Sequence, residues 1–115
     1  RLVMDVLTET AFQDVREQVA IDERQMDGFW SATDYVGIHR TWAYGEQALS
    51  LDHYLIMEPT SHWEIFNWMQ YFSTDRLVEE LHAAGFTVRN LMGSLTGEAL
   101  ANTSRELGVI AEPSV

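Results

Sequence analysis

The segment MQYFSTDRLVEELHAAGFTVRNL, residues 69–91, reads as the end of one strand, a capped helix, a tight turn and a second strand. Ser73 or Thr74 can accept hydrogen bonds from the first amides of this helix, and Asp75 suits its positive end. Gly85 stands where a helix end needs a residue with positive φ. The apolar residues of the helix recur at helical spacing and predict a buried stripe: Leu77, Val78 and Leu81.

Upstream, the apolar run RLVMDVL, residues 1–7, is typical of a buried strand. The next segment, TETAFQDVREQVA, residues 8–20, predicts a helix, in which Thr10 and Gln13 have the spacing of a capping box. Its apolar stripe would consist of Phe12, Val15 and Val19. Residues 1–25 are therefore expected to form a strand followed by a helix.

Between residues 26 and 72 the apolar period changes from helical to two, which predicts an antiparallel three-stranded insertion. Its strands are DYVGIHRTWAY (34–44), ALSLDHYLIME (48–58) and SHWEIFNWMQYF (61–72). The third strand is aromatic on both faces, so one face must meet a second layer, a ligand or another subunit.

The last part, residues 73–115, combines the capped helix with two closing strands. The second of these strands is LGVIAE, residues 107–112, and a polar connection, residues 94–106, precedes it. The whole chain is expected to be a single α+β domain with the order strand, helix, three-stranded insertion, helix and two closing strands.

The amino-acid composition restricts the classes of partner that the chain can bind. The chain has 115 residues, a formal charge of −11 and a pI near 4.5, and all seven basic residues are arginines. Such a charge disfavours binding to nucleic acid or to an anionic membrane surface. No run of the sequence has the roughly 20 apolar residues of a membrane span. No cysteine is present, so disulfides and thiol catalysis are excluded, and the cytoplasm is the default location.

Three segments in this order resemble the C-terminal half of a class I S-adenosylmethionine-dependent methyltransferase. They are RLVMDVLT (1–8), YFSTDRLVEELHAAGFTVRNLMG (71–93) and TSRELGVIAEP (103–113). The stretch GFWSATDYVGIHRTWAY (28–44) looks like the β insertion that some small-molecule methyltransferases carry. The resemblance implies that the chain is the C-terminal part of a Rossmann-like sheet.

The resemblance also implies a missing half. The glycine-rich loop and the acidic residue that hold the cofactor in this family have no counterpart here, and GSLTG (93–97) does not follow the required strand-to-helix pattern. The chain begins with Arg1, and the residues from Leu2 onward have the apolar character of a protein core. This is expected of a fragment of a longer protein. S-adenosylmethionine would then bind to the full-length protein, with none bound by the fragment, which would be inactive alone.

Methyl transfer depends mainly on positioning of the acceptor, so aromatic residues of the insertion are candidates for the wall of a substrate site. The substrate-binding candidates are Trp30, Tyr35, His39, Trp42, His62 and Trp63. Either His39 or His62 is a candidate base, and the catalytic residue stays open. The competing interpretation is that these aromatic residues fill a core. The Asp5 side chain either points into an active cleft or forms a hydrogen bond with a neighbouring loop. No histidine pair has metal-ligand spacing.

Two other functions compete with the methyltransferase. A free-standing α+β ligand-binding or dimerisation module would also explain the doubly aromatic strand. An independent enzyme that uses His39 or His62 is less favoured, because no nucleophile, base and orienting group are visible together. Self-association is expected as well, through an uncovered edge of the strand Leu2–Leu7.

Overall fold

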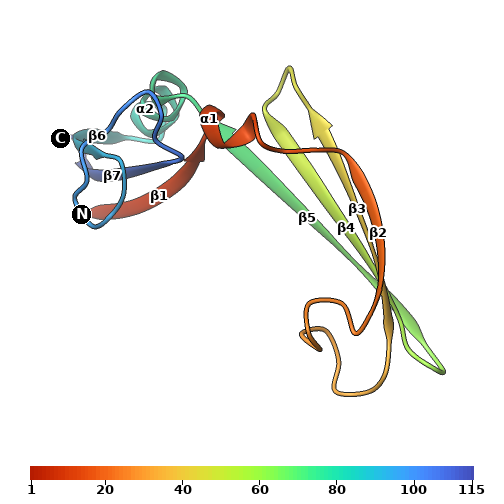
Figure 1. Ribbon diagram of the computed structural model, residues 1–115. Helices are drawn as coiled ribbons and strands as arrows, with labels where there is room; N and C mark the ends of the chain where they lie inside the picture. The colour runs from red at the N-terminus through yellow and green to blue at the C-terminus, as the bar shows by residue number, and fades with distance from the viewer. The chain divides into compact units, whose positions relative to one another are not determined.

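The computed structural model describes all residues from Arg1 to Val115 and divides into two units (Figure 1). The first unit comprises residues 1–14 and 70–115, and the second comprises residues 15–69. In chain order the elements are β1 (Leu2–Thr8), α1 (Glu9–Phe12), β2 (Gln18–Glu23), β3 (Val36–Tyr44), β4 (Leu49–Met57), β5 (His62–Phe72), α2 (Thr74–Ala83), β6 (Phe86–Met92) and β7 (Glu106–Pro113). Neither helix has the length and apolar character needed to cross a membrane.

In the first unit, β7 lies between β1 and β6 and runs antiparallel to both. Its pairing with β1 extends from Leu2 opposite Ala111 to Leu7 opposite Glu106. The last residues of β5 add a short parallel pairing at the other edge of β1, where Leu7 and Thr8 lie opposite Tyr71 and Phe72. The two closing strands predicted from the sequence are therefore present, and the final one is inserted inside the sheet.

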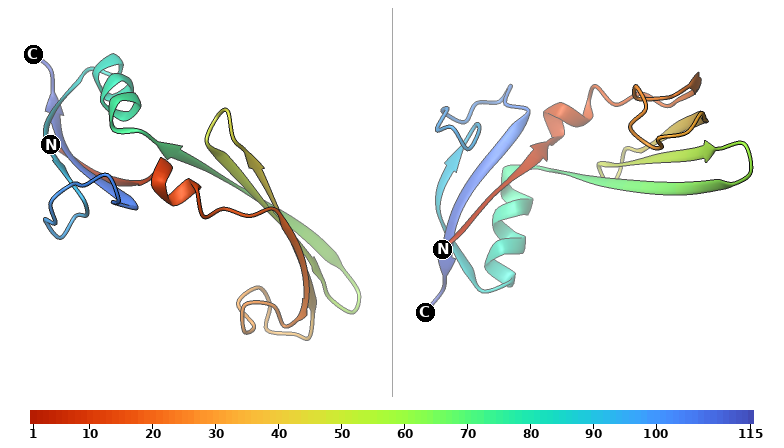
Figure 2. Two further views of the ribbon diagram at one scale, coloured as in Figure 1. Left: turned by 45° about the horizontal axis from the view of Figure 1, so that its top comes forward. Right: turned by 90° about the horizontal axis from the view of Figure 1, so that it is seen from below.

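The register of β1 and β7 builds the core of this unit. It aligns alternate residues on one face, and α2 runs along that face (Figure 2). The buried residues are Leu77, Leu81, Leu107, Val109 and Ala111, and Leu2, Met4 and Val6 pack against them. The predicted helix is confirmed: the Ser73 side chain accepts from the Arg76 amide, and Gly85 has φ +91° just beyond the end. The opposite face of β1 is open, with Val3 54% exposed and Asp5 exposed in mid-strand.

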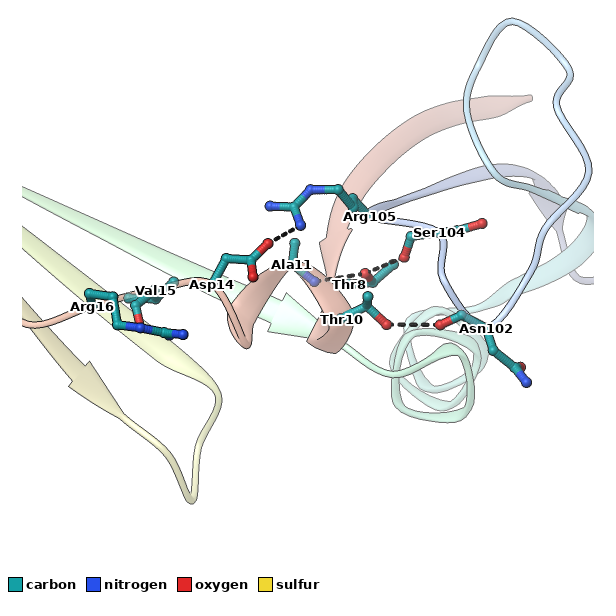
Figure 3. A network of polar contacts seen from close by, with 9 residues as sticks. All are labelled: Thr8, Thr10, Ala11, Asp14, Val15, Arg16, Asn102, Ser104 and Arg105. Carbon is teal, nitrogen blue, oxygen red and sulfur yellow. Dashed lines mark hydrogen bonds and ion pairs between the residues drawn. The ribbon is translucent and has the colours of Figure 1, made fainter.

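Hydroxyl groups at the carboxyl end of β1 attach the long connection between β6 and β7 (Figure 3). Thr8 Oγ1 accepts from the Ala11 amide at 3.3 Å and donates to the Ser104 carbonyl oxygen at 2.6 Å. Thr10 Oγ1 donates to the Asn102 carbonyl oxygen at 3.0 Å. These bonds satisfy backbone groups that the irregular connection would otherwise leave unpaired. An ion pair between Arg105 and Asp14 also joins the connection to the residues after α1.

The prediction of a helix over residues 8–20 is wrong. Only Glu9–Phe12 is helical, its cap is Thr8 rather than Thr10, and no capping box forms. Residues Gln18–Glu23 form β2 instead, so Val19 is an exposed strand residue and not part of a helical stripe. The physical reason is non-local: six residues of β2 pair with β3, and the β-branched Val19 and Ile21 suit a pleated surface.

The second unit is a meander in which β2, β3, β4 and β5 lie side by side, as Figure 1 shows. The insertion therefore has four strands, and the prediction of three is corrected by the addition of β2. Pairing of β3 with β4 is antiparallel and uninterrupted, from Val36 opposite Met57 to Tyr44 opposite Leu49. The connection between β2 and β3 folds back on the sheet. Gln25 lies against Gly37, where a Cβ atom would stand only 2.4 Å from Gln25 Oε1.

We predict that Leu107→Ala lowers the free energy of unfolding by about 3 kcal/mol, because it leaves a cavity beneath α2. Leu107 is fully buried in the core of the first unit. Val3→Ala is the matched control on the open face of the same sheet and should change the value by less than about 1 kcal/mol. Urea unfolding followed by circular dichroism measures both. Equal losses in the two variants would contradict the one-sided core.

Candidate functional site

The two faces of the meander differ in chemistry. We call one of them the His39 face. It carries Gly37, His39 and Thr41 of β3 and Asp52, Tyr54 and Ile56 of β4, which the register places together. His39 lies opposite Tyr54, and Thr41 lies opposite Asp52. The alternate residues of the same strands form the other face, which is mainly apolar.

A histidine–carboxylate pair lies on the His39 face. His39 Nε2 is 2.7 Å from Asp52 Oδ1, and Thr41 Oγ1 donates to the same oxygen at 2.7 Å. The His39 and Asp52 side chains are 19% and 25% exposed, so a ligand can reach them while water screens them only in part. Because a carboxylate oxygen accepts hydrogen bonds, Nε2 is the ring nitrogen that donates to Asp52. Such a pair can orient an imidazole toward a polar group or accept a proton.

Tyr54 covers the imidazole. Its ring stacks on that of His39 with centroids 4.2 Å apart and planes 12° from parallel. Burial raises the pKa of Tyr54 above its ordinary value of 10.0, and the negative charge of Asp52 raises the pKa further. Both effects favour the neutral phenol, so Tyr54 remains a hydrogen-bond donor throughout the neutral and mildly alkaline range.

An aromatic cluster continues from Tyr54 into the connection between β2 and β3. The Trp30 ring lies 5.0 Å from the Tyr54 ring and 5.8 Å from that of Trp63, and Phe29 packs edge-on against it at 4.8 Å. The indole nitrogen of Trp63 donates to Glu58 Oε1 at 3.0 Å. The indole nitrogen of Trp30 is buried and has no hydrogen-bond partner. An unpaired buried donor is costly, so an acceptor that reached it would gain affinity.

An open pocket of about 800 Å³ adjoins this cluster through Glu58. Its lining residues are Glu23, Arg24, Asp34, Tyr35, Val36, Met57, Glu58 and Pro59. Three carboxylates face one guanidinium there, which favours a hydroxylated or cationic ligand over an anionic one. Tyr35 is itself buried, and its hydroxyl donates to the Gln25 carbonyl oxygen, so its main role is to hold the connection in place.

The structure brings together three of the residues expected to bind substrate: Trp30 and His39 both contact Tyr54, and Trp63 contacts Trp30. Trp42 lies on the opposite face, where the Arg40 guanidinium stands 4.6 Å from its ring. His62 is exposed at the start of β5, and the alternation of side chains along a strand places it on the face opposite Trp63. The structure therefore separates the two candidate bases, and only His39 has a carboxylate partner on this face.

Sequence reasoning missed Asp52, Tyr54 and Glu58. A signal was present in the period-two pattern, which places Asp52 and Tyr54 on one face of their strand. The partner strand and its register decide which histidine they meet, and neither follows from a single segment. Nowhere in residues 1–115 do three or more histidine or acidic side chains gather closely enough to hold a metal ion.

Comparison with known proteins identifies a similar fold but no related sequence. No family model matches the chain, and no curated protein matches its sequence. Among solved structures, the chain is similar to the CcbJ methyltransferase from Streptomyces caelestis, with a TM-score of 0.57 and 12% sequence identity. The alignment covers 98% of this chain and 43% of that chain. The chain has a methyltransferase-like fold and spans less than half the length of that enzyme.

The glycine-containing segment after β6 does not form a nucleoside site. The segment from Gly93 to Gly97 lies after β6, but it closes on itself: the Gly93 amide donates to the Glu98 carbonyl oxygen at 2.7 Å. The next element is β7, so no helix N-terminus faces this loop. A glycine-rich phosphate or nucleoside cradle needs that helix. The segment from Gly93 to Gly97 therefore does not fit the nucleoside of S-adenosylmethionine.

We predict that Tyr54 ionises above pH 10 and that Asp52→Asn lowers its pKa part of the way back, because burial, the larger cause, remains. The folded-state pKa exceeds the unfolded value, so the stabilisation of the neutral phenol is present below pH 10 and is lost as the pH rises through the folded pKa. Absorbance of tyrosinate near 295 nm measures the titration, and Tyr54→Phe assigns it. A midpoint below that of an ordinary tyrosine would contradict the description of this site.

Proposed function

We propose that the chain is the substrate-side portion of an S-adenosylmethionine-dependent methyltransferase that acts on a small molecule. The cofactor is held by another part of the polypeptide, and the portion described here is inactive alone. The similarity in fold to a methyltransferase supports this proposal, because it covers nearly all of this chain but less than half of the enzyme. The segments that resemble the C-terminal half of the class I family support it independently.

The observation that carries the proposal is the clustering of binding groups on the His39 face. Tyr54, Trp30 and Trp63 provide flat apolar surface for the body of an acceptor. The His39–Asp52 pair and the carboxylate of Glu58 provide polar groups that fix its orientation. Pockets for small molecules commonly combine an apolar wall with a few placed polar groups. The bound cofactor supplies the methyl group, whereas this chain binds and orients the acceptor.

A second candidate is a free-standing α+β module that binds a ligand without changing it. One observation favours it: the His39 face is built entirely from residues of the second unit. Both functions use the same binding groups, so substitutions on this face do not separate them. Cofactor binding by the polypeptide that contains this chain does separate them.

We predict that residues 1–115 alone bind no S-adenosylmethionine in isothermal titration calorimetry, whereas the polypeptide as encoded in its gene binds it in the micromolar range. The reason is that this chain lacks a nucleoside cradle. Asp52→Asn in the encoded polypeptide is the matched control and should leave the cofactor affinity unchanged, because Asp52 belongs to the acceptor side. Micromolar binding by residues 1–115 would contradict the division of labour. Absence of binding by the encoded polypeptide would favour the non-catalytic module.

A further inference from the structure

The second face of the meander is a broad apolar surface, which we call the Phe66 face. Six of its large apolar side chains are each between 39% and 65% exposed: Val19, Ile21, Tyr44, Met57, Phe66 and Trp68. They come from all four strands of the meander and surround ring contacts between Tyr44 and Trp68 and between His53 and Phe66. We propose that this face binds the same face of a second copy of the chain.

The size of the surface fits a dimer. A large side chain presents about 150–250 Å² when fully exposed, so these six half-exposed residues contribute on the order of 600 Å². A stable interface buries about 800 Å² on each partner, and the half-buried Trp42 and Leu55 between these residues add to the area. A patch of this extent is above what scattered apolar residues on a monomer produce.

The distribution of charge favours this face for a contact between two copies. The chain carries 18 acidic residues and seven arginines, so two copies repel each other across most of their surfaces. The Phe66 face carries little of this charge: Arg40 and Glu64 lie within it, and Glu23 lies at its end. Two copies can therefore approach through this face with the least repulsion.

The arrangement of the charges is self-complementary. Arg40 on β3 lies opposite His53 on β4, and His53 Nε2 contacts Glu64 Oε2 on β5 at 3.0 Å. The three residues form a row across the strands with a cation at one end, a stacked imidazole in the middle and a carboxylate at the other end. A two-fold axis parallel to β4 places Arg40 of one copy against Glu64 of the partner subunit. Such an isologous contact forms twice in the dimer.

This surface differs from the strand edge that the sequence indicated. Association through the edge of β1 would involve backbone pairing in the first unit, whereas the Phe66 face acts through side chains of the second. Val3, which is exposed on β1, gives a control outside the Phe66 face. The two routes to a dimer are therefore separable by substitution.

Sedimentation velocity and equilibrium on the encoded polypeptide test the proposal. We expect a dimer in the wild type. Phe66→Asp and Trp68→Asp should each raise the dimer dissociation constant at least about tenfold, since each buries a charge in the interface. Val3→Asp should leave the constant unchanged. Circular dichroism verifies that each variant is folded, which is expected because Phe66 and Trp68 are exposed within one chain.

A charge exchange gives the sharper test. Arg40→Glu and Glu64→Arg should each weaken the dimer about tenfold by placing like charges together, and the double variant should restore it. A monomer at all concentrations overturns the proposal and indicates that a different partner covers this face. A dimer that Val3→Asp disrupts, while Phe66→Asp does not, overturns it in favour of association through β1. Failure of the double variant to restore association overturns the proposed two-fold arrangement.

Discussion

The register between β3 and β4 is the constraint on which the second unit depends. Nine consecutive residue pairs fix which side chains share a face, from Val36 opposite Met57 to Tyr44 opposite Leu49. A shift of β3 by one residue would turn His39 to the opposite face and bring Arg40 beside Asp52 and Tyr54 in its place. The polar pair, the stacked ring and the apolar opposite face are therefore consequences of one pairing. The backbone bonds of the ladder hold that pairing more firmly than any single side-chain contact.

Local chemistry made part of the fold predictable. The helix α2 carries its own beginning and end in Ser73 and Gly85, and its buried residues follow a period that needs no partner to be recognised. The closing strands were equally readable, because Leu107 to Ala111 form an apolar run bounded by polar residues. In both cases the decisive signal lies within about ten residues, so a single segment was sufficient.

The failures share a non-local cause. Residues 18–23 have apolar positions that fit both a helix and a strand. Pairing of these six residues with β3 stabilises the strand. The site was half predictable for the same reason. Trp30, His39 and Trp63 are conspicuous residue types in an aromatic insertion, whereas Asp52 becomes important only because β4 lies beside β3 in this register. The type of a residue can be read from one segment of sequence, whereas its partner on a neighbouring strand cannot.

No helix packs on the four-stranded meander within residues 15–69, so both faces of this sheet need other groups to cover them. On the His39 face, the connection between β2 and β3 supplies Trp30 and Gln25 as partial cover, and the remaining gaps are lined by polar groups. On the Phe66 face, nothing from residues 15–69 provides such cover, and large apolar side chains remain in water. Hydrophobic exposure of this kind is unfavourable by roughly 25 cal/mol for each Å². The two faces thus favour different occupants: a small polar or aromatic ligand on one, and an extended apolar surface on the other. A single sheet can serve both because successive side chains of a strand point in opposite directions.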